Sequence, residues 1–282
     1  MQTDWNDWIG RKATSEDVIA PWPLAALAAM LDRDEPAPKL GDPLPPLAHW
    51  LYFLPVDRQS DVGPDGHAKR GGFLPPVPLP RRMWAGGRIS FEAPLRVGDA
   101  ATRDSQIVDV VAKEGRSGPL VFVVVRHAIR GDAGLAIVEE HDIVYRGAAP
   151  AGVATPPPAA PVDAAWTHEI EPDPVLLFRY SALTFNSHRI HYDRRYVTDV
   201  EDYPGLVVHG PLIATLLVDL LRRANPHARV SRFTFRAVSP LFDTAPFFVR
   251  GHPAPDGRSV HLWAANVHGG LAMDATVALA PA

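Results

Sequence analysis

The chain has 282 residues, of which 46% are hydrophobic and 21% are charged, and its net charge at pH 7 is −4. These shares are typical of a globular protein and exclude a disordered chain. A slightly acidic chain lacks the basic field that binds phosphate backbones, so we expect no nucleic-acid partner. The absence of cysteine excludes disulfides, thiolate metal sites and cysteine nucleophiles, and it favours a cytoplasmic location.

The hydropathy pattern offers no candidate for a membrane span. The longest uncharged run in the C-terminal half covers residues 203–218 and is interrupted by Pro204, His209 and Pro211. It falls short of the ~18 consecutive apolar residues that a spanning helix needs. We therefore expect no membrane partner.

Proline marks the division of the chain. The 30 prolines cluster in residues 36–80 and 150–161. The second cluster has few charges and no periodic apolar pattern, which is typical of a stiff extended linker. We therefore predict an N-terminal domain over residues 1–146, a Pro/Ala-rich linker over residues 147–165 and a C-terminal domain over residues 166–282.

In the first half, a short helical segment precedes a group of strands. Pro21 and Pro23 stand where proline is tolerated at a helix start, and residues 24–32 are rich in Ala and Leu. Four segments rich in Val and Ile follow, each bounded by Gly, Pro or Asp, which is the pattern of an antiparallel meander. They cover residues 88–94, 103–112, 120–130 and 136–144.

The second half repeats this order. An apolar segment begins at Val175, and a helix is predicted over residues 210–224. Strand-like segments then cover residues 230–238, 246–251, 259–266 and 271–278. Residues 92–95 align with residues 238–241, because each segment carries a Pro-Leu pair directly after a strand-like run. The sequence therefore predicts an α+β fold built from a duplicated unit.

The predicted helix over residues 210–224 is the most informative element. Gly210 and Pro211 open it, and proline is well tolerated in the first helical turn. The helix is apolar on nearly every face until Asp219, so it should be buried on most sides. These features predict a sheet wrapped around one buried helix.

The densest polar segment covers residues 181–195 and allows several interpretations. His188 and His191 could bind a metal together with His209, but this spacing without a matching carboxylate is a weak zinc signal. The histidines could equally be loop and core residues without chemistry. A catalytic interpretation rests on a resemblance to a known family.

Residues 184–193 read Thr-Phe-Asn-Ser-His-Arg-Ile-His-Tyr-Asp, and residues 203–212 read Tyr-Pro-Gly-Leu-Val-Val-His-Gly-Pro-Leu. This pair of segments resembles the MaoC-type, or hydratase-2-type, hotdog enzymes, whose pattern is Ser-Gly-Asp-x-Asn-Pro-Leu-His-x-Asp followed by a His-Gly pair. His191 and Asp193 match that pattern, whereas Asn186 replaces its first Asp and His188 replaces its Asn. The variant resembles the branch that contains mesaconyl-CoA and itaconyl-CoA hydratases and mitochondrial-type hydroxyacyl-thioester dehydratases.

The first half carries part of the same resemblance. Residues 75–88, with Pro-Pro-Val-Pro-Leu-Pro-Arg-Arg-Met-Trp, and residues 94–99 are similar to the N-terminal hotdog of that branch. The resemblance implies a double hotdog, two units that each wrap an antiparallel sheet around a central helix. It also implies that the first unit lacks the catalytic motif and helps to form the acyl tunnel, while the second unit is catalytic.

The implied reaction, addition of water to an enoyl thioester, needs a base, a proton for the α-carbon and donors for the thioester oxygen. A neutral imidazole can accept and return a proton near neutral pH, so His191 is the predicted acid–base group. Asn186 can hydrogen-bond to water or substrate but cannot titrate. The backbone N–H of Gly210, at the positive end of a buried helix, is the predicted oxyanion donor.

The same resemblance assigns substrate binding to side chains around the motif. Arginines there could hold the phosphates of coenzyme A or a substrate carboxylate, or they could form an ordinary solvated loop. The pair Arg81 and Arg82 in the first half allows the same two interpretations. The residues assigned to substrate binding are Phe185, Arg189, Arg194 and His209.

The predicted activity is therefore a hydro-lyase that adds water reversibly to an α,β-unsaturated acyl-CoA, with mesaconyl-CoA and itaconyl-CoA as candidates. We expect no metal and no organic cofactor, since coenzyme A is part of the substrate. A 3-hydroxyacyl-ACP dehydratase of fatty-acid synthesis, a hotdog thioesterase and a non-catalytic acyl-CoA-binding module remain as alternatives. The sequence leaves open whether two chains pair as a homodimer.

Overall fold

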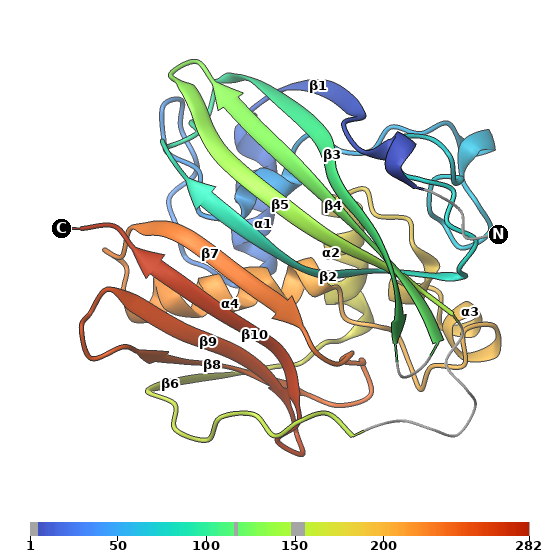
Figure 1. The fold of residues 1–282 in the computed structure, drawn as a ribbon. Helices are drawn as coiled ribbons and strands as arrows, with labels where there is room; N and C mark the ends of the chain where they lie inside the picture. Colours follow the sequence, from blue (N-terminus) through green and yellow to red (C-terminus); the bar gives the residue numbers. More distant parts are fainter. Residues whose placement is uncertain (1–4, 116–117, 148–155, 282) are drawn as a thin grey trace.

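The computed structural model describes residues 5–115, 118–147 and 156–281. Within these residues, ten strands form one antiparallel sheet in the order β1-β3-β4-β5-β2-β7-β10-β9-β8-β6 (Figure 1). The strands are β1 (Lys12–Val18), β2 (Arg81–Phe91), β3 (Ala100–Gly115), β4 (Gly118–Gly131), β5 (Gly134–Arg146), β6 (Trp166–Ile170), β7 (Val230–Ala237), β8 (Phe247–Pro253), β9 (Ser259–Asn266) and β10 (Leu271–Leu279).

Few helices accompany this sheet in the described residues. The α-helices are α1 (Pro21–Met30), α2 (Pro174–Leu183), α3 (Arg194–Asp199) and α4 (Gly210–Ala224). Short 3₁₀ turns are η1 (Asn6–Trp8), η2 (Ala48–Leu51), η3 (Gln59–Asp61) and η4 (Arg189–His191).

The two halves of the sheet have the same strand order. The first half runs β1-β3-β4-β5-β2, and the second half, followed from its outer edge, runs β6-β8-β9-β10-β7. They join where β2 pairs with β7, and there a Cβ on Gly86 would lie 2.5 Å from the carbonyl oxygen of Phe235. Glycine is therefore required at this close approach. The matching strand orders of the two halves confirm the duplicated α+β unit predicted from the sequence.

The turns after β2 and β7 show the duplication in detail. The N–H groups of Glu92 and Ala93 both donate to the carbonyl of Ala136. The N–H groups of Val238 and Ser239 both donate to the carbonyl of Ala272. The structure thus gives the two aligned Pro-Leu segments the same hydrogen-bond pattern.

Helix α4 forms the centre of the second half. Residues 212–221 are all buried, and the helix contacts β6, β8, β9 and β10 (Figure 1). Asp219 is buried with them because Arg33 Nη1 and Arg223 Nε donate to its carboxylate at 2.6 and 2.7 Å. These two arginines satisfy a charge that would otherwise be costly to bury.

Most predicted elements are present, with revised limits. The predicted helix over residues 24–32 is α1, which begins at Pro21, and β2 begins at Arg81 rather than at residue 88. The edge strands β1 and β6 were not predicted from the sequence. Only Ile170 of β6 is buried and no residue of β1 is, so neither strand shows a clear alternation of polar and apolar residues.

The domain limits at residues 146 and 166 stay a prediction. Residues 148–155 of the predicted linker lie outside the described residues, and residues 156–165 contain only an isolated bridge between Ala159 and Gly270. Among the described helices, none is long and apolar enough to cross a membrane.

Candidate active site

The motif of residues 184–193 follows α2 as a sequence of tight turns. Phe185 has a positive φ of 48° and is 60% exposed at the first turn. Asn186 then accepts a hydrogen bond on its side-chain oxygen from the N–H of His188 at 3.0 Å. This is an Asx turn, a geometry that both Asn and Asp stabilise. Asp193 ends the motif by accepting the N–H of Tyr196 and capping α3.

His191 is held in one orientation within the protein. The ring is 8% exposed, and its Nδ1 lies 2.7 Å from the carbonyl oxygen of Val207. Since a carbonyl can only accept, Nδ1 carries the proton and Nε2 keeps its lone pair. Burial lowers the pKa of His191 to about 4, although the hydrogen bond to Val207 acts in the opposite direction. The ring is therefore a neutral base at pH 7.

His209 packs directly against His191. The two rings stack with centroids 3.7 Å apart and an interplanar angle of 18°. His209 is fully buried, its Nε2 lies 2.8 Å from Ser181 Oγ, and its Nδ1 has no partner. Burial lowers the pKa of His209 well below its usual value. His209 therefore packs against the His191 ring, and its predicted part in substrate binding stays a prediction.

Gly210 begins α4, directly after His209. Its N–H has no hydrogen-bond partner among the described residues, as is usual in the first helical turn. A Cβ built on Gly210 would meet no atom within 4 Å, so open space surrounds this position. The geometry is compatible with the predicted oxyanion donor, whose role stays a prediction.

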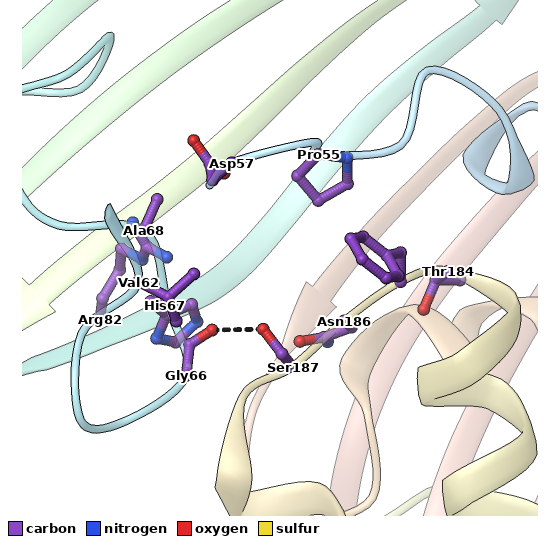
Figure 2. Close-up of a pocket in the computed structure, with 11 residues that line it drawn as sticks. Pro55, Asp57, Val62, Gly66, His67, Ala68, Arg82, Thr184, Asn186 and Ser187 are labelled. Carbon is purple, nitrogen blue, oxygen red and sulfur yellow. Dashed lines mark hydrogen bonds between the residues drawn. The ribbon is translucent and has the colours of Figure 1, made fainter. Parts of the chain in front are cut away.

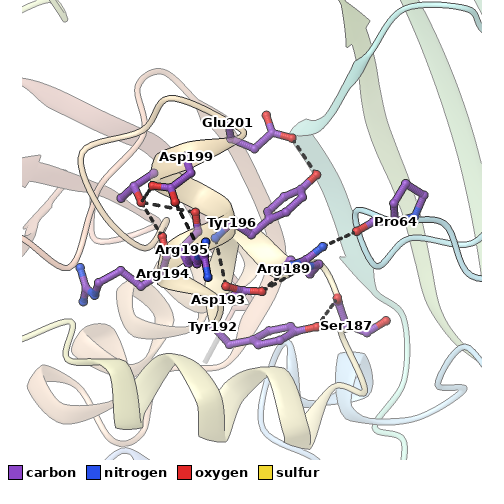
Figure 3. Close-up of polar contacts among 11 residues, drawn as sticks. Pro64, Ser187, Arg189, Tyr192, Asp193, Arg194, Arg195, Tyr196, Asp199 and Glu201 are labelled. Carbon is purple, nitrogen blue, oxygen red and sulfur yellow. Dashed lines mark hydrogen bonds and ion pairs between the residues drawn. The ribbon is translucent and has the colours of Figure 1, made fainter.

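A loop from the first half closes over the motif. The N–H of Arg189 donates to the carbonyl of Asp65 at 2.9 Å, and Ser187 Oγ donates to the carbonyl of Gly66 at 2.6 Å. The Arg189 guanidinium adds a hydrogen bond to the carbonyl of Pro64 at 3.0 Å (Figure 3). Gly66 has φ +91°, and a Cβ there would lie 1.8 Å from the carbonyl oxygen of Ser187. Only glycine allows this contact.

This loop adds a histidine that the sequence analysis did not single out. His67 lies with its Nδ1 3.1 Å from Asp65 Oδ2, and its N–H donates to Asp65 Oδ1 at 3.0 Å. Its ring centroid is 3.9 Å from that of His188, which in turn is 5.4 Å from that of His191. His67, His188, His191 and His209 therefore form a continuous imidazole row. Its first member comes from the first half of the chain.

A pocket of about 180 Å³ opens between the loop and the motif (Figure 2). Phe185 and Asn186, which the sequence analysis assigned to the site, line this pocket. His67, which the sequence analysis did not assign to the site, lines it with them. His191, His209 and Gly210 do not line this pocket, and His188 contacts both His67 and His191. The lining residues are Pro55, Asp57, Val62, Gly66, His67, Ala68, Arg82, Thr184, Phe185, Asn186 and Ser187.

Arg82 brings a positive charge to the pocket. Among the described residues, no carboxylate forms an ion pair with Arg82. The Arg82 side chain is hydrogen-bonded to the hydroxyl of Tyr145. Burial raises the pKa of Tyr145, while the charge and the hydrogen bond of Arg82 act against that rise. The adjacent Arg81 differs, since its Nε lies 3.7 Å from Glu201 Oε2 and its guanidinium lies over the ring of Tyr203.

Two arginines predicted to bind substrate already have protein partners. Arg189 pairs with Asp193 at 2.8 Å and lies 4.1 Å over the ring of Tyr196 (Figure 3). Arg194 pairs with the buried carboxylate of Asp243. These contacts favour a structural role, because a substrate would have to compete with an existing ion pair. The substrate-binding role of both arginines stays a prediction that the geometry does not favour.

The fold and the site together define a hotdog-fold hydro-lyase. The family model for hydroxyacyl-thioester dehydratase type 2 matches residues 47–243, so the chain belongs to that family. The fold class, the enzyme class and the family resemblance predicted from the sequence are thereby confirmed.

Known proteins show the same relationship over nearly the whole chain. The mesaconyl-C(4)-CoA hydratase of Chloroflexus aurantiacus is 50% identical over 277 residues, which are 98% of each chain. The MaoC-like dehydratase of Phytophthora capsici superposes with a TM-score of 0.72 at 13% identity, over 99% of this chain and 98% of that one. A double-hotdog protein of Mycobacterium tuberculosis superposes with a TM-score of 0.56 at 14% identity, over 96% of each chain.

Proposed function

We propose that this hydro-lyase adds water reversibly to mesaconyl-C4-CoA. Two observations support this substrate over other enoyl thioesters. The 50% identical relative is named for that substrate and matches 98% of the chain. The pocket beside the catalytic motif contains Arg82, whose guanidinium has no carboxylate partner among the described residues.

The chemistry of the acyl group connects it to Arg82. In mesaconyl-C4-CoA, the β-carbon carries a methyl group and a free carboxylate, and the thioester lies at the other end. An unpaired guanidinium can bind a carboxylate through two parallel hydrogen bonds. Because Arg82 and Asn186 line the same pocket, a carboxylate on Arg82 would hold the β-carbon close to the motif. The Arg82 guanidinium, which has no carboxylate partner among the described residues, is the observation that carries the choice of substrate.

The motif supplies the groups for the reaction. The Gly210 N–H binds the thioester oxygen and stabilises the negative charge that develops there. The Nε2 atom of His191 takes a proton from water, and the water oxygen bonds to the β-carbon. The electrons of the double bond move into an enolate, which then takes a proton at the α-carbon. Asn186 orients water or substrate by hydrogen bonding.

Further parts of the proposal concern the enzyme as a whole. We propose that the reaction uses neither a metal nor an organic cofactor, with coenzyme A entering only as part of the substrate. A cytoplasmic location is supported by the absence of cysteine. A homodimer stays a prediction, which light scattering after size-exclusion chromatography tests directly.

Product analysis by mass spectrometry tests the function. The protein is incubated separately with mesaconyl-C4-CoA, itaconyl-CoA, crotonyl-CoA and crotonyl-ACP. We expect mesaconyl-C4-CoA to gain the mass of one water with the highest kcat/KM. Release of free coenzyme A would instead indicate a thioesterase, and binding without reaction would indicate an acyl-CoA-binding module. A preference for crotonyl-ACP would indicate a dehydratase of fatty-acid synthesis.

Two neighbouring arginines provide a matched test of the substrate. Arg82→Gln should lower the ratio of kcat/KM for mesaconyl-C4-CoA to that for crotonyl-CoA by at least about tenfold, since a hydrogen bond to a charged group is lost. Arg81→Gln removes a charge that pairs with Glu201 and should leave this ratio unchanged. A ratio that stays the same in Arg82→Gln would rule out Arg82 as the carboxylate anchor.

A further inference from the structure

The buried face of the first half carries polar side chains where the second half carries apolar ones. Glu139 and His141 of β5 occupy the positions that Ala275 and Val277 occupy on β10, because β5 and β10 pair in the same register with β2 and β7. Ala275 and Val277 are 3% and 0% exposed. The fold is thus built equally well with apolar side chains at these positions. Since a buried ion pair gains little over apolar packing, stability alone does not explain Glu139 and His141.

The contacts of these two polar side chains converge on two indoles. Trp50 Nε1 donates to Glu139 Oε1 at 2.8 Å. His141 Nε2 is hydrogen-bonded to the same carboxylate oxygen, and the His141 ring lies 4.3 Å from the ring of Trp84, centroid to centroid. Trp84 Nε1 in turn donates to the carbonyl of Gly86 at 2.8 Å. The Glu139 carboxylate therefore fixes Trp50 directly and Trp84 through His141.

The two indoles and Phe235 form an aromatic cluster at the junction of the two halves. The ring centroids of Trp50 and Trp84 are 4.9 Å apart, and that of Phe235 lies 6.1 and 5.5 Å from them. Trp50 comes from η2, Trp84 from β2 and Phe235 from β7, so the cluster reaches from η2 to the pair of strands that joins the halves. Phe235 is buried, whereas both indoles are partly exposed. Trp50 and Trp84 can therefore offer apolar surface to a ligand.

Trp84 is the next side chain after Arg82 on the same face of β2. Side chains two residues apart on a strand project from one face, roughly 7 Å apart, and the register shift in β2 comes only after Trp84. Arg82 is hydrogen-bonded to Tyr145, and Trp84 contacts His141, which lies on the same face of β5 as Tyr145. An acyl chain that continues past Arg82 along this face consequently meets the ring of Trp84.

We propose that Trp84 and Trp50 form an end wall of the acyl site and restrict the enzyme to short acyl groups, an inference that rests on the function proposed above. The β-carbon of mesaconyl-C4-CoA carries only a methyl group and a carboxylate, so its acyl group ends at Arg82. A straight eight-carbon chain has further carbons beyond this point, and they would have to displace an indole that the Glu139 carboxylate holds in place. Glu139 acts as a positioning residue for the end wall.

The rival interpretation is that the aromatic cluster only packs the two halves together. Under that interpretation, a smaller side chain at Trp84 leaves a cavity and lowers stability, but it changes the affinities for short and long acyl groups alike. The end wall instead predicts a change in their ratio. Relative affinity therefore separates the two interpretations.

Binding of saturated acyl-CoAs tests the end wall without turnover. Isothermal titration calorimetry gives the Kd values of the full-length protein for butyryl-CoA and octanoyl-CoA. In the wild type, octanoyl-CoA should bind at least about tenfold more weakly, because methylenes that do not fit a pocket are costly. Trp84→Leu should lower the ratio of the octanoyl-CoA Kd to the butyryl-CoA Kd by at least about tenfold. Trp84→Phe, which keeps an aromatic ring against Phe235, should lower it by about threefold.

Matched substitutions control for a general loss of structure. Trp22→Leu, at an indole that is 69% exposed on α1, should leave the Kd ratio unchanged. Glu139→Ala, studied below its melting temperature, should lower the ratio by about threefold, because Trp50 loses its acceptor. Glu140→Ala, whose carboxylate pairs with Arg88 and Arg126, should leave the ratio unchanged.

Two results would overturn the end wall. One is a wild-type protein that binds octanoyl-CoA as tightly as butyryl-CoA. The other is a Kd ratio within about twofold of wild type in every folded variant at Trp84, with folding checked by circular dichroism. The proposed function is decided separately, because the Kd values do not depend on the reaction. A wild-type enzyme that binds acyl-CoA but hydrates none of the thioesters would refute that function and leave the Kd comparison as the test of the end wall.

Discussion

Each half of the molecule buries a cluster of histidines, and the two clusters differ in their partners. In the first half, Glu139 is 2% exposed and bonds to His49 Nε2 at 3.0 Å, to Trp50 Nε1 at 2.8 Å and to His141 Nε2 at 2.5 Å. In the second half, the described residues offer His191 and His209 one hydrogen-bond partner each, the Val207 carbonyl and the Ser181 hydroxyl.

The partners decide the protonation state in each cluster. Burial by itself would raise the pKa of Glu139, but His141 and His49 outweigh it and hold this pKa well below its usual range. Around His191 and His209, burial lowers both pKa values, and no carboxylate of the described residues opposes it. The same residue type therefore stabilises a buried charge in one half and presents a neutral base in the other.

The helical elements that precede β2 and β7 in the two halves also differ, in their length. Helix α4 has 15 residues and carries Gly210 at its start, whereas η2 in the first half has four residues. The longest helix that the structure describes in the first half is α1, which has 10 residues and only three buried side chains, so this half offers no counterpart of the buried α4. It contributes the loop with His67 and the strand residue Arg82 to the pocket beside the motif instead.

The largest expected effect concerns stability in the first half. Glu139→Ala should lower the free energy of unfolding by about 3–5 kcal/mol, because it leaves His49, His141 and Trp50 without their shared acceptor. Urea denaturation followed by tryptophan fluorescence measures this change. Glu140→Ala, next in sequence but paired with the partly exposed Arg88 and Arg126, should cost less than about 1 kcal/mol. Equal losses in the two variants would contradict a special role for the buried cluster.

The next effect concerns catalysis in the second half. His191→Gln should lower kcat for hydration by at least about a hundredfold, which corresponds to about 2.7 kcal/mol of activation free energy. Gln is preferred to Ala because the ring is buried and stacked on His209, so a smaller side chain would leave a cavity. His188→Gln should be milder. An essential His188 beside a dispensable His191 would remove the assignment of the base.

The lowered pKa of His191 sharpens the comparison through pH. On the acid side, kcat/KM should stay level through pH 6.5, where an exposed histidine titrates, and fall as pH approaches about 4. The stability should also depend on pH, since His191 protonates more readily when unfolded. The contribution of neutral His191 to the free energy of unfolding is complete above pH ~6.5, and it is lost as pH falls from there towards the folded-state pKa. Initial rates after a rapid pH jump measure the first effect, and urea titrations measure the second. An acid limb near 6.5 would show that the ring is solvated.

The smallest expected effect lies at Asn186. Asn186→Ala should lower kcat by at least about fivefold, because a positioned hydrogen-bonding group is lost at about 1 kcal/mol. The substitution also removes the acceptor for the His188 N–H, so Asn186→Asp, which keeps that acceptor, serves as the matched variant. Steady-state rates and melting temperatures of both variants separate the two contributions. A kcat for Asn186→Ala within about twofold of wild type would show that the amide does not assist the reaction.

Local pattern determined a large part of this protein. The helix predicted over residues 210–224 and the strand predicted over residues 259–266 are α4 (Gly210–Ala224) and β9 (Ser259–Asn266), with the same limits. The order of elements in each half and the motif around His191 were also readable. Burial of one face of a strand leaves alternating apolar residues in the sequence, and burial of a whole helix leaves a long apolar run, which is why these elements could be predicted.

Only the tertiary structure decided how the two halves share the site. The edge strands β1 and β6 are mostly polar and become strands through pairing with β3 and β8. Arg81 and Arg82 are adjacent in sequence, yet one pairs with Glu201 and the other lines the pocket. His67 reaches His188 across more than a hundred residues of chain. Such contacts depend on the folded path of both halves, and no local periodicity records them.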